Sequence, residues 1–395
     1  MTARVPDVSV LIVNWKSGAM TRALVGNLRR QRFAGRDGGP GTLEFAVTDN
    51  ASGPEEESHL AALEQEPDVT LIRSAQNGGY AVGMNLAAER ARGDWFLVSN
   101  PDVMAFRGAL AALLDHLRGT ERCGLAGPKG YLDAQRFFQL PPVDLPGLSE
   151  LAYETLARRC APAGRRHAEG RTRRALAAWT ATAPLSRSQI SGFCFLMPAP
   201  LARELGPFDS RFPFYFEDAD LCHRLHGKGF TTDLVPRAQM VHFFNRSAGQ
   251  AQAAAMSRYH VSRRWFFRKR YGPPGALLYD ALAGLDDGHG QGHLFAPVDA
   301  LGVCDAVPAI DVPGHGPYLA EISADQGFMF AAGRLDVSRR FQMPQAVWDG
   351  LVPAPYFVRF LDRRSLTILR TVSLTKHGAS VPITAEIAAA ELAHA

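Results

Sequence analysis

The sequence reads VSVLIV at residues 8–13 and WFLV at residues 95–98. Continuous runs of β-branched and aromatic residues, with no polar alternation, are typical of strands that are buried on both faces of a sheet. Strand-like and helix-like patterns alternate around these two runs. This alternation predicts an α/β fold of the Rossmann-like type, with a mostly parallel sheet and helices on both faces.

The expected elements follow from the same patterns. Further strands are expected at residues 43–47, 69–72 and 190–197. Helices are expected at 19–31, 55–64, 81–92, 109–118 and 201–205, with another beginning within 214–228. Because ligands gather at the carboxyl ends of parallel strands, we expect the site at that edge of the sheet.

Composition excludes several classes of protein. The chain has 395 residues, 46% hydrophobic and 21% charged, and its net charge is +4. This is a globular composition with too little positive charge to indicate a nucleic-acid partner. Five cysteines without a CxxC pair argue against a disulfide framework or a structural zinc site. With no signal peptide and no apolar stretch of about 18 residues, we predict a cytoplasmic protein, at most peripheral on a membrane.

Four polar clusters stand just after predicted strands or an aromatic run. They are Asp49, the segment 77–80 (NGGY), the segment 100–102 (NPD) and the segment 217–220 (EDAD). A parallel sheet would bring them to one cleft. Taken singly, each has a plainer explanation as a helix cap or a turn.

Two residues have the chemistry of metal ligands. Asp102, which follows the rigid Pro101, offers a hard oxygen that suits Mg²⁺ or Mn²⁺ on a diphosphate. His242 is a candidate second ligand. A lone histidine in an apolar run is also commonly a hydrogen-bonded core residue, so the sequence leaves both interpretations open.

The acids Glu217, Asp218 and Asp220 are the most informative cluster. Three acids within four residues repel one another unless a cation or a helix N-terminus compensates them. Four aromatic residues lie at positions 212–216, and an apolar wall raises the pKa of a nearby carboxyl. The cluster therefore indicates a proton acceptor that works near neutral pH, with an acidic first helical turn as the plainer alternative.

In order and spacing, these motifs resemble the inverting sugar-nucleotide glycosyltransferases of family 2, which have the GT-A fold. The resemblance is greatest to bacterial rhamnosyltransferases, and it covers about the first 240–270 residues. The motifs that carry it are VSVLIVNW at 8–15, VTDNAS at 47–52, NGGYAVGMN at 77–85, FLVSNPD at 96–102, SG at 191–192, GPFD at 206–209, FYFEDADLCHR at 214–224 and VH at 241–242.

The resemblance implies roles for individual residues. Asp218 would be the general base, with Glu217 and Asp220 as supporting or rival acids. Asp102 and His242 would bind Mg²⁺ or Mn²⁺; Asn100 stands where the family has the first acid of its Asp-x-Asp motif, which weakens the expected metal affinity. The residues implied to contact the donor nucleotide are Val13, Asn14, Asp49, Asn77, Gly79, Asn85, Asn100 and Asp102.

The resemblance also implies a reaction. The chain would move a sugar, with L-rhamnose from dTDP-rhamnose as the first expectation, from a nucleoside diphosphate to a hydroxyl of a glycan or lipid-linked acceptor in bacterial cell-surface polysaccharide synthesis. A UDP- or GDP-hexose donor is the alternative. A non-catalytic nucleotide-sugar-binding scaffold in a polysaccharide assembly complex is another.

We expect three regions. Residues 1–250 form the GT-A catalytic domain, with an Arg/Pro-rich insertion at 133–189. Residues 251–284 form a basic helical extension ended by Pro273-Pro274, which either contacts a membrane surface or packs its aromatics on the catalytic domain. Within the insertion, the Arg-rich residues 151–187 are either a mobile, solvated loop or a contact for a membrane or, less expected, a nucleic acid.

Residues 285–395 are expected to form a small all-β, sandwich-like domain, with turn-forming residues at 288–292. Its strands are expected at 318–323, 327–331, 347–351, 356–362 and 366–372. Acceptor binding, homodimer formation and buttressing of the catalytic domain are all open as its role.

Overall fold

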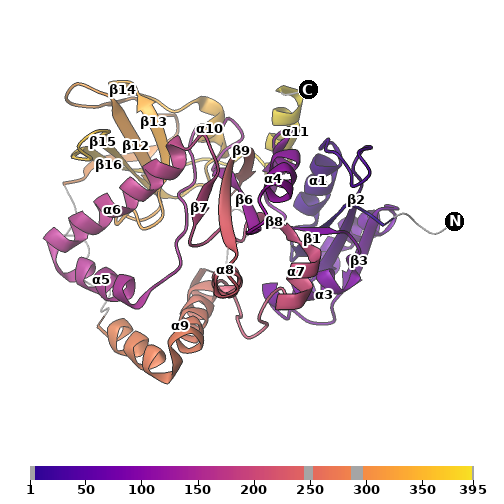
Figure 1. Cartoon of the computed structure of the whole chain (residues 1–395). Helices are drawn as coiled ribbons and strands as arrows, with labels where there is room; N and C mark the ends of the chain where they lie inside the picture. The colour runs from indigo at the N-terminus through magenta and orange to yellow at the C-terminus, as the bar shows by residue number, and fades with distance from the viewer. Residues whose placement is uncertain (1–4, 244–251, 286–296, 394–395) are drawn as a thin grey trace.

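The computed structural model describes residues 5–243, 252–285 and 297–393 (Figure 1). The expected turn at 288–292 and the first residue of the expected helix at 251 lie outside these residues. The first half of the chain alternates strands and helices, as the sequence predicts. Its elements are β1 (Val8–Asn14), α1 (Gly18–Arg29), β2 (Leu43–Asp49), η1 (Pro54–Glu56), α2 (Glu57–Glu64), β3 (Val69–Arg73), α3 (Tyr80–Arg90), β4 (Trp95–Ser99), β5 (Val103–Ala105) and α4 (Ala109–Gly119).

The second half completes the sheet. Its elements up to the last helix of this part are β6 (Cys123–Tyr131), α5 (Leu148–Arg159), α6 (Ala161–Thr180), β7 (Leu185–Arg187), β8 (Cys194–Pro198), α7 (Ala199–Leu205), α8 (Glu217–Gly227), β9 (Thr231–His242) and α9 (Gln252–Ala283). The strand order is β3-β2-β1-β4-β8-β6-β9-β5, with β7 paired to β9. The run β3-β2-β1-β4 is entirely parallel, which confirms the expected Rossmann-like sheet. Antiparallel β8, β5 and β7 make the other half mixed.

Helices cover both faces of this sheet because β1 is apolar on both. Val8, Val10 and Ile12 pack with residues of α1 and α4. Leu11 and Val13 pack with residues of α3, α7 and α8 on the opposite face. All seven residues of β1 are buried. The strand ends at Asn14, so its carboxyl end places a polar side chain at the edge where the site lies.

The strands β5, β6 and β9 were not predicted. The β6 sequence is CGLAGPKGY, and glycine and proline are disfavoured in strands. Burial between β8 and β9 overrides that weak local preference. The strand expected at 190–197 begins only at Cys194.

The interpretation of residues 151–187 as a mobile loop is wrong. The segment forms the two helices α5 and α6, which pack against each other. Several of its arginines are held by partners: Arg174 pairs with Asp144 at 3.0 Å, and Arg171 donates to the Phe328 and Gly327 carbonyls. These contacts, which are distant in sequence, order a segment whose local pattern is merely polar.

The C-terminal module, residues 297–393, differs in part from the expected all-β sandwich. It contains β10 (Asp299–Cys304), β11 (Ile310–Asp311), β12 (Tyr318–Ser323), β13 (Ala332–Val337), β14 (Arg340–Phe341), α10 (Gln345–Gly350), β15 (Pro355–Asp362), β16 (Ile368–Lys376) and α11 (Ile383–Ala393). A five-stranded sheet, β10-β16-β15-β12-β13, accompanies a two-stranded one. The strand expected at 347–351 is helix α10, and 327–331 contains no strand.

The module and the insertion share one hydrophobic core. Phe138, which is 0% exposed, belongs to the same cluster as Trp348 and Phe360 of the module. Gln139 and Gly333 exchange two backbone hydrogen bonds of 2.8 Å. In Figure 1, α6 runs beneath the C-terminal sheet, where its Trp179 packs with residues of β12 and β15. The apolar, Pro-rich stretch of the insertion is thus explained by burial against the module.

Helix α9 packs its aromatics inward. Phe266 and Phe267 are fully buried, and a kink at Gly272 (φ 70°) precedes Pro273-Pro274. Of its cations, Arg263 pairs with Glu154 and Lys269 with two acids. Phe266 packs with Phe212 and Phe216, so the aromatics of the extension lie against the first domain. Contact with a membrane surface stays a prediction.

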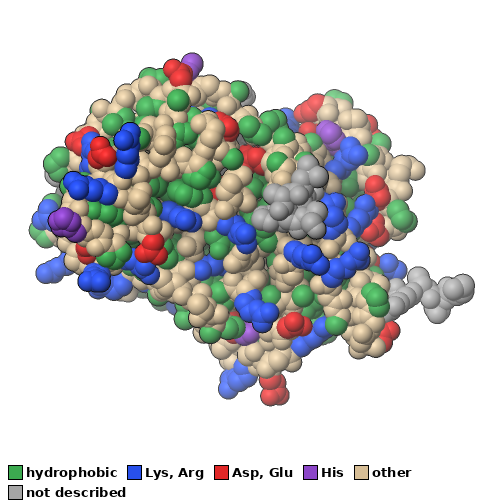
Figure 2. All heavy atoms as spheres, turned by 90° about the horizontal axis from the view of Figure 1, so that it is seen from above, with side chains coloured by type: hydrophobic (Ala, Val, Ile, Leu, Met, Phe, Trp, Pro, Cys, Tyr) green, Lys and Arg blue, Asp and Glu red, His purple; other side chains and the backbone are tan. Residues whose placement is uncertain are grey.

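Two further observations bear on partners. Among the described residues, no helix is both long enough and apolar enough to cross a membrane. On the face drawn in Figure 2, Lys and Arg side chains are spread among acidic and uncharged ones. They do not form one continuous patch on that face.

Candidate functional site

Two acids stand at the N-terminus of α8, after a strained turn. Tyr215 and Phe216 have φ values of 63° and 69°, a left-handed conformation that is rare for large side chains. Each such residue costs on the order of 1–3 kcal/mol, and such strain clusters at functional sites. The turn places Glu217 and Asp218 in the first helical turn, where the helix dipole favours negative charge.

The Asp218 carboxylate is held at both oxygens. The Gly192 N–H donates to Oδ2 at 2.8 Å, and the Ala219 N–H donates to Oδ1 at 2.8 Å. A side chain at 192 would have its Cβ only 3.1 Å from the Asp218 Cβ, so glycine allows this approach. Burial raises the pKa of Asp218 while these hydrogen bonds oppose the rise. The result is a fixed carboxylate with increased affinity for a proton.

Glu217 is the more deeply buried of the two acids. Its residue is 6% exposed, and its Oε2 has no hydrogen-bond partner among the described residues. Burial, followed by the nearby charge of Asp218, raises the pKa of Glu217 well above the usual carboxyl range. Ionisation of one of these acids therefore disfavours ionisation of the other.

Asp220, the third predicted acid, has a different environment. It is 1% exposed and forms ion pairs with Arg224 at 2.8 Å and with Lys269 at 2.6 Å. Through Lys269 it ties α8 to α9. This carboxylate is compensated by two cations, which leaves Asp218 and Glu217 as the candidate acid–base groups.

Asp102 and His242 face each other from β4 and β9. Asp102 lies just after β4, and its carboxylate is 3.4 Å from His242 Nε2 at the end of β9. The Phe193 ring stacks on the His242 ring with centroids 5.0 Å apart, which fixes the orientation of the imidazole. Asn100 Nδ2 lies 3.4 Å from the same Nε2. Two ligands on one octahedral ion, each bound at about 2.1 Å, lie about 3 Å apart, so the pair fits a divalent cation.

Asp102 and two acids of α8 lie near the same two tyrosines. The negative charges of Glu217, Asp218 and Asp102 all contribute to raising the pKa of Tyr80, after burial. The same three acids, again after burial, raise the pKa of Tyr215 to about 12. The Tyr80 hydroxyl also reaches the Gly192 carbonyl at 3.4 Å. Residues far apart in the chain thus converge on one site.

The carboxyl ends of β1 and β2 form a second polar group. Asn14 and Asp49 are direct neighbours in the parallel register, and Asn14 Nδ2 donates to Asp49 Oδ1 at 2.8 Å. Ser52 Oγ donates to the same oxygen at 2.5 Å and lies 3.1 Å from Asn14 Nδ2. Val13, next to Asn14, is 7% exposed. Asn14, Asp49 and Ser52 are therefore mutually positioned.

Asn50, which was not predicted as a site residue, connects this group to the loop 77–79. Its Nδ2 donates to Asn77 Oδ1 at 3.0 Å and to the Gly79 carbonyl at 3.1 Å. Gly79 has φ 87° and caps the N-terminus of α3 at Tyr80. Ser52, Tyr80, Gly192 and Tyr215 were also missed as site residues. Their signal was present in the motifs, but none of them carries a charge.

Asn85 is placed differently from the other predicted residues. Its Nδ2 donates to the Phe208 carbonyl at 2.8 Å, and its Oδ1 accepts from the Phe208 N–H at 3.1 Å. The side chain therefore ties α3 to the segment 206–209. This packing role was not foreseen from the sequence.

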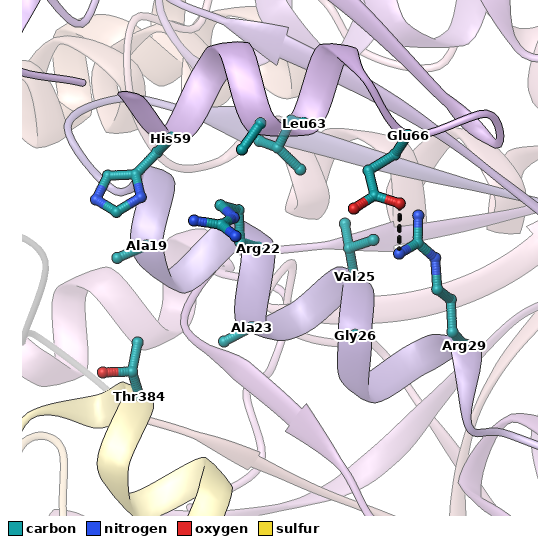
Figure 3. Close-up of a pocket in the computed structure, with 11 residues that line it drawn as sticks. Ala19, Arg22, Ala23, Val25, Gly26, Arg29, His59, Leu63, Glu66 and Thr384 are labelled. Carbon is teal, nitrogen blue, oxygen red and sulfur yellow. Dashed lines mark ion pairs between the residues drawn. The ribbon is translucent and has the colours of Figure 1, made fainter. Parts of the chain in front are cut away.

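A cavity of about 500 Å³ opens beside Asp218. Gln189, Ser191 and Tyr215 line it near the acid, and its far walls come from other parts of the chain. A second cavity of about 380 Å³ lies between α1, α2 and α11, next to the Arg29–Glu66 ion pair (Figure 3). None of the predicted site residues lines that second cavity.

Comparisons with known proteins indicate the class of enzyme. The model of the family described as glycosyl transferase family 2 matches residues 9–143. The N-acetylglucosaminyl-diphospho-decaprenol L-rhamnosyltransferase of two Mycobacterium tuberculosis strains is 27% identical over 229 residues, which covers 53% of this chain and 70% of the relative. These matches define the chain as a glycosyltransferase. Its residues 9–143 are similar to glycosyl transferase family 2, as the motifs indicated.

Two solved structures are similar at lower levels. The mannosyltransferase PcManGT from Pyrobaculum calidifontis, in complex with GDP-Man and Mn²⁺, has a TM-score of 0.44 and 16% identity, covering 74% of this chain and 78% of its own. GalNAc-T7 with UDP, GalNAc and Mn²⁺ has a TM-score of 0.46 and 14% identity, covering 66% and 48%. Scores of this size do not establish a donor or a metal for this chain.

Proposed function

We propose that this chain is an inverting glycosyltransferase that moves L-rhamnose from dTDP-rhamnose to a hydroxyl of a glycan or lipid-linked acceptor. The similarity to this family supports a nucleotide-sugar donor and a separate acceptor. The choice of rhamnose rests on the name of the relatives at 27% identity. A role in cell-surface polysaccharide synthesis belongs to the same proposal.

One observation carries the proposal: Asp218 is fixed on the wall of a cavity while Asp102 and His242 face each other nearby. Asp218 and Asp102 are close enough for both charges to act on Tyr80 and Tyr215. A base and a site for a diphosphate-bound cation are therefore available around one reaction centre. A binding scaffold has no need of a buried pair of acids with raised pKa.

Proton transfer is the first task of these residues. An acceptor hydroxyl attacks the anomeric carbon from the face opposite the diphosphate, and Asp218 takes its proton as the new bond forms. The bond from the anomeric carbon to the diphosphate oxygen breaks in the same displacement, so the configuration inverts. The Gly192 and Ala219 N–H groups hold the Asp218 carboxylate in place during this transfer.

Stabilisation of the leaving diphosphate is the second task. Asp102 and His242 would hold Mg²⁺ or Mn²⁺, which supplies positive charge to the leaving oxygens when bound. The nucleoside would lie along the carboxyl ends of β1 and β2, beside Val13, Asn14 and Asp49. Asn50 connects this edge to Asn77 and Gly79. Asn100 adds a neutral amide beside the metal ligands. Asn85 supports this pocket from behind through the segment 206–209.

The test is donor turnover without an acceptor. The purified chain is incubated with dTDP-rhamnose, UDP-glucose or GDP-mannose, each with Mn²⁺ or Mg²⁺, and release of nucleoside diphosphate is measured. We expect the greatest release from dTDP-rhamnose. Faster release of nucleoside diphosphate from the UDP- or GDP-sugar would show that the donor is a hexose nucleotide and not dTDP-rhamnose. Thermal stabilisation by nucleoside diphosphates without any release, with acceptors included, would identify a scaffold instead.

A further inference from the structure

The cavity beside Asp218 has walls from four separate parts of the chain. Asp218 and Tyr215 come from the catalytic domain, and residues 141–144 come from the apolar stretch of the insertion. Helices α5, α6 and α9 add further side chains. The C-terminal module closes the cavity with Glu321 and residues 329–331. The module therefore reaches the same space as the proposed catalytic base.

The module is fixed in this position by a buried polar network. Glu321 and Arg359, 2% and 3% exposed, form an ion pair of 2.5 Å. Thr172 of α6 donates to Glu321 at 3.1 Å and accepts from Arg359 at 3.1 Å. Such a network tolerates no shift of the partners, because an unpaired buried charge is costly. The module's part of the cavity wall is thus held in a fixed position by buried hydrogen bonds and an ion pair.

The cations in the lining already have partners within the protein. Carboxylates outnumber guanidinium groups in the lining: the acids are Asp144, Glu150, Glu154, Asp218 and Glu321, and the cations are Arg171, Arg174 and Arg263. Arg174 pairs with Asp144 and Arg263 with Glu154. Arg171 donates its terminal nitrogens to two backbone carbonyls. A negatively charged ligand in this cavity would therefore be repelled by the excess of carboxylates.

The rest of the lining suits a sugar. Tyr215, Phe216 and Tyr259 present aromatic rings, and an apolar ring face packs against the C–H groups of a pyranose. The Nε–H groups of Arg171 and Arg263 are buried and have no partner among the described residues. Hydroxyl oxygens are acceptors that would satisfy such groups without adding charge.

We propose that this cavity is the acceptor site, that it takes an uncharged sugar, and that the C-terminal module is the part of the chain that selects it. The inference rests on the proposed function for the reaction that follows binding. Of the three roles left open for the C-terminal module, the inference selects acceptor binding. The reacting hydroxyl of that sugar lies at Asp218, and the rest of the acceptor extends between the insertion and residues 329–331.

The test measures binding separately from catalysis. Saturation-transfer difference NMR is recorded with the p-nitrophenyl glycosides of glucose, galactose, mannose and N-acetylglucosamine, and with p-nitrophenyl glucuronide as the charged counterpart. Met329→Trp and Val143→Trp fill the cavity from the module and from the insertion, respectively. Met329 is 41% exposed, so its replacement should leave the fold intact. Val303→Trp, at a site 67% exposed on β10 and outside the lining, is the matched control.

We expect the full-length chain and Val303→Trp to bind at least one neutral glycoside, and both cavity variants to bind it at least about tenfold more weakly. Release of nucleoside diphosphate without acceptor should stay unchanged in Val303→Trp, which lies outside the cavity. Stronger binding of the glucuronide, unchanged binding in both cavity variants, or no binding of any glycoside would each overturn the inference. If glycosides bind as expected but no donor is turned over, the proposed function fails and the binding site stands.

Discussion

The Gly192 N–H donates a 2.8 Å hydrogen bond to Asp218 Oδ2, and a Cβ at position 192 would lie 3.1 Å from the Asp218 Cβ. Gly192→Ala should therefore push Asp218 aside by a few tenths of an ångström. We expect kcat to fall about tenfold or more with little change in thermal stability, since small misplacements of a catalytic group are costly. Gly39→Ala is the control, because nothing lies within 4 Å of a Cβ there. Equal kcat values for the two variants would refute the tight fit.

Asp218→Asn should keep donor binding and lose turnover. The amide keeps the shape, and its single oxygen can accept one of the two backbone hydrogen bonds, but it cannot take a proton. General-base catalysis contributes about 10²–10⁴-fold, and kcat should fall by that factor. Donor binding is measured by thermal shift with the nucleoside diphosphate. Turnover close to that of the unmodified chain would show that another group is the base.

The acid side of the pH–rate profile for transfer should lie at a higher pH than an ordinary carboxyl group would give. The base is active only when ionised, and the pKa of both Asp218 and Glu217 lies above its ordinary value because the groups are buried. The rate, as kcat/KM, should therefore still rise with pH above the ordinary carboxyl pKa of about 4. Glu217→Gln removes the neighbouring acid and should move the acid side of the profile to lower pH. An acid side that stays in place in this variant would show that the two acids are not coupled.

Transfer should require a divalent cation, and His242 should contribute to the affinity for it. Chelation by EDTA is expected to abolish transfer, and Mn²⁺ or Mg²⁺ to restore it. Loss of a group that orients a ligand costs about 10–100-fold in metal affinity, and loss of a ligand should cost at least as much. His242→Ala should raise the Mn²⁺ concentration for half-maximal rate by that factor, whereas His377→Ala, at an exposed residue on the module, should not. A rate indifferent to EDTA would remove the metal from the proposal.

The buried pair Arg359–Glu321 should dominate the stability of the module's contact with α6. Arg359→Met leaves Glu321 buried and unpaired, which costs about 3–5 kcal/mol. Arg363→Met, which breaks an exposed pair with Asp336, should cost less than about 1 kcal/mol. Urea unfolding measures both. The double variant Arg359→Met/Glu321→Leu should recover much of the loss, and failure to recover would mean that the charge is not the cause.

The sequence predicted the first half of the fold well because the signals there are local. β1 and β4 are continuous apolar runs, and β2 ends at Asp49 as the polar cluster indicated. Acids that stand at element ends could be selected as site candidates from their position alone. The uncharged residues around them, such as Gly192 and Ser52, could not, because only contact with a charged neighbour reveals their use.

The second half was harder to predict for a physical reason. Strand β6 has weak local preference and is formed by its neighbours, and α10 occupies a stretch whose pattern favoured a strand. The segment 151–187 looked unstructured because its partners lie outside it, some of them more than a hundred residues away, as Arg171 and Phe328 show.

For this protein, the sequence by itself determined the parallel sheet, the chemistry of the acids and the glycosyltransferase class, because periodicity and side-chain type are written residue by residue. Only the tertiary structure decided that Asp220 is compensated by Lys269, and that Asp102 faces His242. It also decided that Glu321 of the C-terminal module lines the cavity of Asp218. Such pairings depend on which distant segments are buried together, and burial is a property of the whole chain.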